Sequence, residues 1–136
     1  MKCLFLDANI LFTAAHNPSG KAALVLELGT LGHWRMVTST LAVEEASRNL
    51  TAKYPSAVSR LEILLRDMTV LPSVSGRDCP IDLPAKDRPI FLTALRYGAT
   101  HLLTGDMRHF GPFMDVDDAS QTAGIRITTV AAFLAD

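Results

Sequence analysis

The chain has 136 residues, of which 49% are hydrophobic and 20% charged, and its net charge is −1. This length and composition fit one α/β domain spanning residues 1–136, and they exclude a chain that attracts nucleic acid through an overall positive field. Cys3 and Cys79 lie far apart, so they predict neither a zinc site nor a disulfide framework. No apolar run reaches the roughly 18 residues of a membrane span, and no signal peptide precedes the first strand. We therefore expect a cytoplasmic protein without membrane contact.

Short apolar runs alternate with helical periodicities, which predicts a parallel sheet covered by helices on both faces. The stretch 72–84 combines proline with Ser, Gly and Asp and is predicted to be a loop. The predicted strands are 2–6, 35–38, 68–71, 101–104 and 126–128. The predicted helices are 9–15, 21–31, one from Ser39 or Thr40 to about Thr51, one from Tyr54 to Leu65, one from Asp87 to Gly98, and one at the C-terminus.

Two of these strands end on an acid. Asp7 directly follows the run at 2–6, and Asp106 follows the run at 101–104 after one glycine. In open α/β sheets the ligand crevice lies beyond the carboxyl ends of the strands, so we expect both side chains there. Glu45 and Asp87, on predicted helices, are candidates for the same crevice.

A crevice that gathers several carboxylates is unfavourable without a cation. Two such charges about 4 Å apart repel by roughly 4 kcal/mol at an effective dielectric of about 20. A hard divalent cation among them removes this cost, because Mg²⁺ prefers oxygen ligands. The acid pattern therefore predicts a metal-dependent enzyme.

Each acid also has a structural interpretation. Asp7 could simply cap the following helix, and Asp87 could lie in a first helical turn because the helix dipole favours an acid there. Glu44 and Glu45 are adjacent and point about 100° apart on a helix, so only one of them can face the crevice. A further acidic group lacks the full spacing of a calcium loop and is expected in a solvated loop: Asp115, Asp117 and Asp118.

Four segments, taken together and in order, resemble the PIN domain. The similarity covers nearly the whole chain, and it implies a three-layer α/β/α fold around a mostly parallel sheet of about five strands. The segments are Leu6-Asp7-Ala8-Asn9, the stretch Thr38 to Glu45, Asp87 with the apolar helix Ile90 to Leu95, and the stretch Leu103 to Phe110.

The resemblance also implies a set of site residues. By position, the metal-binding and catalytic acids would be Asp7, Glu45, Asp87 and Asp106, with Glu44 as the fallback for Glu45. Small polar residues that support the site would be Asn9 and Thr104. One position departs from the pattern, because toxin-type members often carry Asp or Asn three residues after the last strand acid, where this chain has His109.

The implied activity is hydrolysis of RNA phosphodiester bonds with Mg²⁺ or Mn²⁺, and many PIN proteins of this size are toxins of toxin–antitoxin pairs. The partners expected are therefore RNA, a cognate antitoxin and a second copy of the chain. A catalytically inactive PIN-like module that acts through protein or RNA contacts is the alternative. Four cations flank the acid motifs and are candidates for phosphate contact: Arg48, Lys86, Arg88 and Arg108.

Overall fold

The structure, a computed structural model, describes residues 1–76, 78–114, 116 and 118–136, so Asp115 and Asp117 lie outside the described residues. Its strands are β1 (Cys3–Leu6), β2 (Arg35–Ser39), β3 (Thr69–Leu71), β4 (His101–Leu103) and β5 (Arg126–Thr128). Its α-helices are α1 (Ala8–His16), α2 (Lys21–Thr30), α3 (Thr40–Lys53), α4 (Val58–Leu65), α5 (Arg88–Arg96) and α6 (Val130–Ala135). Short 3₁₀ turns are η1 (Pro55–Ala57), η2 (Gly111–Phe113) and η3 (Ala119–Thr122). Every predicted strand and helix is present, with ends shifted by one or a few residues.

The strands in the described part of the chain form one five-stranded sheet in the order β3-β2-β1-β4-β5. Every neighbouring pair is parallel, so the sheet is parallel throughout. All four residues of β1 are buried, because this central strand is covered on both faces. The predicted sheet is thereby confirmed.

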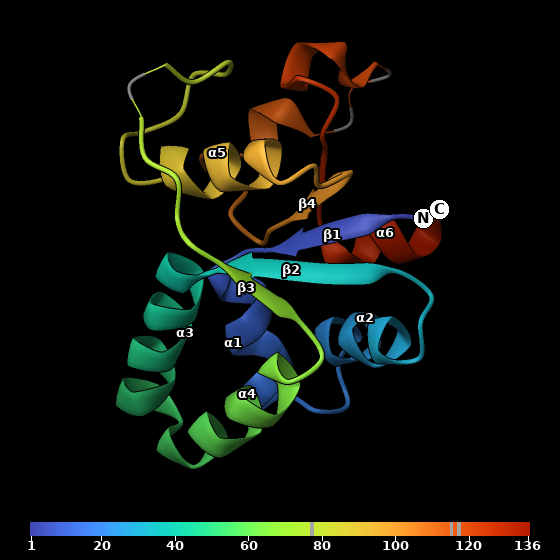
Figure 1. Ribbon diagram of the computed structural model, residues 1–136. Helices are drawn as coiled ribbons and strands as arrows, with labels where there is room; N and C mark the ends of the chain where they lie inside the picture. The colour runs from blue at the N-terminus through green and yellow to red at the C-terminus, as the bar shows by residue number, and fades with distance from the viewer. Residues whose placement is uncertain (77, 115, 117) are drawn as a thin grey trace.

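Helices cover both faces of the sheet. Helices α1, α2, α3 and α4 pack together below the sheet in Figure 1, whereas α5 lies above it. The apolar side chains of β1 and β4 are almost completely buried between these two helical layers. This arrangement confirms the expected three-layer α/β/α fold.

Local sequence signals set the ends of several helices. Ser39 rather than Thr40 caps α3, and its hydroxyl accepts the backbone N–H of Ala42 at 3.1 Å. The segment that follows Tyr54 begins as the 3₁₀ turn η1 before α4 continues it. After α5, Gly98 takes a positive φ of 74°, which glycine adopts without strain. No helix among the described residues is long and apolar enough to cross a bilayer.

The order of the strands creates a switch point between β1 and β4. From β1 the chain winds outward through β2 to β3, then crosses back to β4 on the other side of β1 and continues to β5. Connections leaving β1 and β4 diverge, and in open α/β sheets a ligand crevice forms at such a point. Asp7 and Thr104 are the first residues beyond these two strands.

Candidate metal centre

Asp7 and Asp106 approach each other through the pairing of β1 with β4. Leu6 is in register with Leu103, and the backbone N–H of Asp7 donates to the carbonyl of Leu103 at 3.1 Å. The two acids therefore lie at the same edge of the sheet, as the strand-end rule predicts.

Asp7 is a carboxylate held in a nearly dry environment, with 6% of its surface exposed. It is also the N-cap of α1, since Oδ1 accepts the backbone N–H of Ala8 at 2.7 Å. The pKa of Asp7 is raised from 3.8 to about 6, mainly by burial and also by the Glu45 and Asp87 carboxylates, against the lowering effect of hydrogen bonds from Thr104 and Ala8. The capping interpretation is thus correct but incomplete, because a cap alone does not require burial beside other acids.

Thr104 links the two strand ends. Its side chain is fully buried, and its hydroxyl donates to Oδ2 of Asp7 at 2.8 Å and accepts the backbone N–H of Asp106 at 3.1 Å. Asn9 adds a second link, because its Oδ1 accepts the N–H of Gly105 at 2.7 Å. These bonds fix the loop after β4 against the start of α1.

Replacing Thr104 with valine is expected to lower the free energy of unfolding by about 1–3 kcal/mol, because the Asp7 oxygen loses its short donor inside the protein. The change keeps the shape of the side chain and removes only the hydroxyl. Chemical denaturation of Thr104→Val and Thr104→Ser measures the effect. The serine variant retains the hydroxyl and should lie close to wild type; equal loss in both variants would contradict a role for the hydroxyl.

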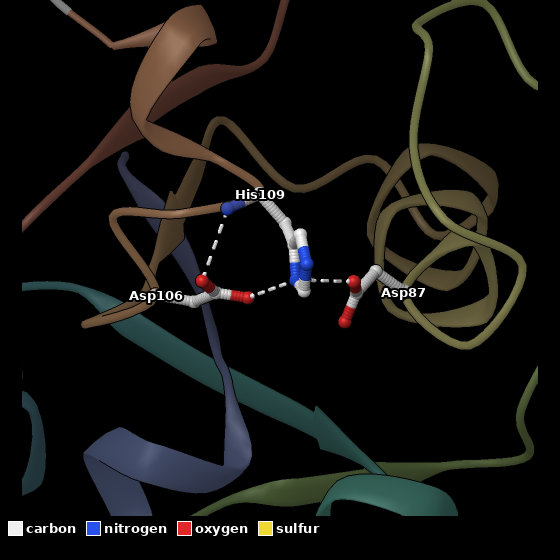
Figure 2. A group of neighbouring side chains, drawn as sticks. All are labelled: Asp87, Asp106 and His109. Atoms are coloured by element: carbon white, nitrogen blue, oxygen red, sulfur yellow. Dashed lines mark hydrogen bonds and ion pairs between the residues drawn. The ribbon is translucent and has the colours of Figure 1, made fainter.

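Asp87, Asp106 and His109 form a compact cluster above this edge (Figure 2). Nδ1 of His109 lies 3.0 Å from Oδ2 of Asp106, to which it donates, and 2.9 Å from Oδ2 of Asp87. Oδ1 of Asp106 accepts the backbone N–H groups of Arg108 and His109, each at 3.1 Å. One carboxylate thus caps the turn that carries the imidazole ring.

Asp87 has a buried oxygen without a hydrogen bond among the described residues. Asp106 accepts the hydrogen on His109 Nδ1, so Oδ2 of Asp87 is in close contact with that nitrogen but receives no hydrogen bond. Burial raises the pKa of Asp87, and the nearby His109 lowers it while Asp106 raises it. A buried carboxylate oxygen that accepts no hydrogen bond is suited to bind a cation, because the cation would compensate its negative charge.

The acids line a single cleft of about 550 Å³. All four acids expected from the resemblance are among its lining residues, whereas Glu44, which is exposed as Glu45 is, does not line the cleft. Glu45 reaches the cleft from α3 and Asp87 from the start of α5. The structure therefore distinguishes between the adjacent glutamates, which spacing alone leaves open.

Two of the four expected cations line the cleft and two do not. Arg48 and Lys86 lie on its wall. Arg88 instead donates through Nε to the carbonyl of Leu83 at 3.0 Å, because it follows Asp87 on the helix and points toward the preceding loop. Arg108 is exposed on the turn after β4 and is outside the cleft lining. Of the four candidates for phosphate contact, Arg48 and Lys86 are therefore the two that line the cleft.

Three aromatic rings beside the cleft, those of Phe12, His16 and Tyr54, are not part of any motif found in the sequence. Phe12 lines the cleft, and its ring centroid lies 4.8 Å from that of His16 and 5.8 Å from that of Tyr54. The His16 and Tyr54 rings are stacked at 4.4 Å, and Nζ of Lys53 lies 5.8 Å from the Phe12 centroid. Phe12 and His16 are four residues apart on α1, so their contact could be predicted, but Tyr54 comes from the far end of α3.

No protein-family model matches the sequence, and no curated protein matches it. Solved structures do match its fold. A PilT N-terminus domain protein from the archaeon Sulfolobus solfataricus P2 superposes with a TM-score of 0.54 at 14% identity, covering 98% of this chain and 91% of that one. The chain has a PIN-domain fold. At these identities the PIN likeness concerns the fold alone.

Two further structural matches are VapBC complexes. DNA-bound VapBC from Salmonella typhimurium matches with a TM-score of 0.64 at 17% identity, over 96% of this chain and 99% of that one. VapBC2 from Rickettsia felis, bound to a promoter DNA fragment, matches with a TM-score of 0.63 at 14% identity, over 93% and 98% of the two chains.

The residues at this edge of the PIN fold fit a divalent cation. Their donors are carboxylate oxygens, one of them buried without a hydrogen bond, together with one imidazole nitrogen. The donor atoms of Asp87, Asp106 and His109 all lie within 4.8 Å of one another. Asp7 and Glu45 line the same cleft and can supply further oxygens.

Proposed function

We propose that this protein is a ribonuclease that uses a divalent metal ion to hydrolyse RNA phosphodiester bonds. The observation that carries the proposal is the gathering of four acids, from the ends of β1 and β4 and from α3 and α5, in a cleft with three cations: Arg48, Lys53 and Lys86. When bound, a divalent ion supplies an activated water and stabilises the charge that grows on the phosphate.

The chain itself supplies the other requirements of the reaction. Asp7, Glu45, Asp87 and Asp106 are the proposed metal-binding and catalytic acids, and Mg²⁺ or Mn²⁺ is the proposed ion. Arg48, Lys53 and Lys86 bind phosphates of the substrate, which offsets the negative charge of the acids for a polyanion. Asn9 and Thr104 hold the acids in place through the bonds described above.

A matched pair of adjacent glutamates tests the function. We expect Mn²⁺-dependent cleavage of an unstructured RNA to fall by at least about 100-fold in Glu45→Gln, which corresponds to about 2.7 kcal/mol in the barrier. Glu44→Gln, which alters the exposed neighbour outside the cleft, should cleave like wild type. Equal activity in all three proteins would overturn the assignment of Glu45. If the wild-type protein binds RNA but cleaves none with either Mg²⁺ or Mn²⁺, the proposed ribonuclease activity is wrong. The alternative, a catalytically inactive module that binds RNA, is then supported.

The aromatic group beside the cleft favours a single-stranded nucleic acid over a small phosphoester. Stacking of one base on an aromatic ring contributes roughly 1–3 kcal/mol. Phe12 lines the cleft, and Tyr54 is 47% exposed and contacts Phe12 through its ring. With Lys53 beside them, these rings can hold a base while its phosphate continues toward the acids.

Alanine at Phe12 or Tyr54 is therefore expected to raise KM for single-stranded RNA by about 10-fold, with kcat nearly unchanged, because base stacking is lost away from the reacting phosphate. Steady-state kinetics on a short unstructured RNA measures both constants. Tyr97→Ala is the matched control, since Tyr97 is 41% exposed at the end of α5 and outside the cleft. An equal rise in KM for the Tyr97 variant would contradict the stacking role.

A toxin role within a toxin–antitoxin pair is the finer part of the proposal, and it draws support from the fold shared with the VapBC complexes. A cognate antitoxin and a second copy of the chain are the proposed protein partners. Growth arrest on expression in bacteria, reversed by a protein encoded beside this gene, is the expected result. Normal growth of cells that contain active protein would count against a toxin.

A further inference from the structure

His109 places one nitrogen at the point where two carboxylates converge. Nδ1 is 2.9 Å from Oδ2 of Asp87 and 3.0 Å from Oδ2 of Asp106, and the ring stands between the two acids in Figure 2. Without an ion, Nδ1 carries the hydrogen that it donates to Asp106. When the hydrogen of the neutral ring is on Nε2 instead, Nδ1 presents a lone pair to a cation. Three potential ligand atoms for one cation therefore lie together: Oδ2 of Asp87, Oδ2 of Asp106 and Nδ1 of His109. They come from two segments, the start of α5 and the turn after β4.

The spacing of these atoms is that of ligands on one ion. Two ligands at right angles, each about 2.1 Å from an ion, lie about 3.0 Å apart. The distances from Nδ1 to the Asp87 and Asp106 oxygens are 2.9 and 3.0 Å, and the donor atoms of the whole group lie within 4.8 Å of one another. The group can thus coordinate an ion with little movement of its side chains.

The backbone around His109 holds the ring at this place. Asp106 accepts the His109 backbone N–H through its side chain, and its carbonyl accepts the N–H of Phe110 at 3.2 Å. Phe110 is completely buried and anchors the turn in the core. A donor fixed in this way loses little conformational entropy when an ion binds.

We propose that His109 Nδ1 is a ligand of the metal ion, and that it makes the site selective for a first-row transition ion such as Mn²⁺ or Co²⁺ over Mg²⁺. This inference rests on the proposed function, since it concerns the ion of the same cleft. Imidazole nitrogen suits transition ions, whereas Mg²⁺ prefers an all-oxygen set and retains its waters.

Metal binding without RNA tests the proposal. Calorimetry with Mn²⁺ and with Mg²⁺ is expected to show that the ratio of the two affinities falls by about 10-fold or more in His109→Ala, mainly through weaker Mn²⁺ binding. His109→Asn, which places an oxygen near the Nδ1 position, should lower the ratio in the same way and keeps the result interpretable if the alanine variant unfolds. His16→Ala, at a histidine outside the cleft lining, is the control and should leave the ratio unchanged.

Pulsed EPR of bound Mn²⁺ gives a direct signature. Wild type and His16→Ala should show coupling to a ¹⁴N nucleus, and both His109 variants should lack it. An unchanged affinity ratio, tighter Mn²⁺ binding in His109→Ala, or the absence of ¹⁴N coupling in wild type would overturn the proposal. If RNA cleavage nevertheless persists, the function stands and this inference fails; if ¹⁴N coupling is present without cleavage, the inference stands and the function fails.

Discussion

Asp7→Asn is expected to abolish metal-dependent RNA cleavage and, in the absence of metal, to make the protein more stable than wild type. Asp7 is almost completely buried, and burial together with the Glu45 and Asp87 carboxylates raises its pKa from 3.8 to about 6. At about 1.4 kcal/mol per pKa unit, the ionised carboxylate costs the folded state roughly 3 kcal/mol at neutral pH. An uncharged amide of the same shape avoids that cost, but it also gives up an oxygen that can bind the ion.

Urea denaturation at pH 7.5 with EDTA measures the stability, and we expect a gain of about 1–2 kcal/mol, because the amide cannot keep the Thr104 hydrogen bond as it stands. Asp82→Asn, at an exposed acid outside the cleft lining, should change stability by less than about 0.5 kcal/mol. If Asp7→Asn were instead less stable than wild type without metal, the charge of Asp7 would not destabilise the folded state. That outcome would contradict the prediction.

The second large effect is a dependence of stability on pH that metal reverses. The folded pKa of Asp7, about 6, lies above its ordinary value of 3.8, so between these values the folded state binds more protons than the unfolded state. The free energy of unfolding therefore decreases as the pH rises through this interval. The contribution of Asp7 is fully unfavourable above about pH 7 and is absent below about pH 3, where both states are protonated.

Subtracting the curve of Asp7→Asn from that of wild type between pH 4 and pH 8 isolates this contribution from the other titrating groups. In EDTA the difference should move by roughly 2–3 kcal/mol in favour of the variant as the pH rises from 4 to 8, and it should reach the gain of about 1–2 kcal/mol expected near neutral pH. Saturating Mn²⁺ should stabilise wild type at neutral pH, where the carboxylates are ionised, and should stabilise the variant much less. A difference curve that is flat in EDTA would contradict the raised pKa.

The sequence predicted the framework well because its signals are local. The run that contains Cys3 to Leu6 has the length and apolar character of a strand buried on both faces, and an acid follows it directly. The rule that parallel strands end at one edge of a sheet then brings Asp7 close to Asp106 without any knowledge of the other contacts.

The rest of the site depends on distances that no local pattern contains. His109 and Asp87 are separated by 22 positions and belong to different elements, so their 2.9 Å contact follows only from the packing of α5 beside the turn after β4. Arg88 seemed suited to the cleft by its place next to Asp87, yet a loop carbonyl binds its guanidinium elsewhere. Tyr54 lies against Phe12 only because α3 ends at Lys53, directly before it.

The switch point in the sheet also divides the proposed metal site between two halves of the chain. Asp7 and Glu45 precede β3 in the sequence, and Asp87, Asp106 and His109 follow it. Neither half alone holds the full set of donors, so an ion bound at the site connects segments that would separate on unfolding. The ion would then act as a cross-link between the first and last parts of the fold, and its release would loosen the association of the two halves.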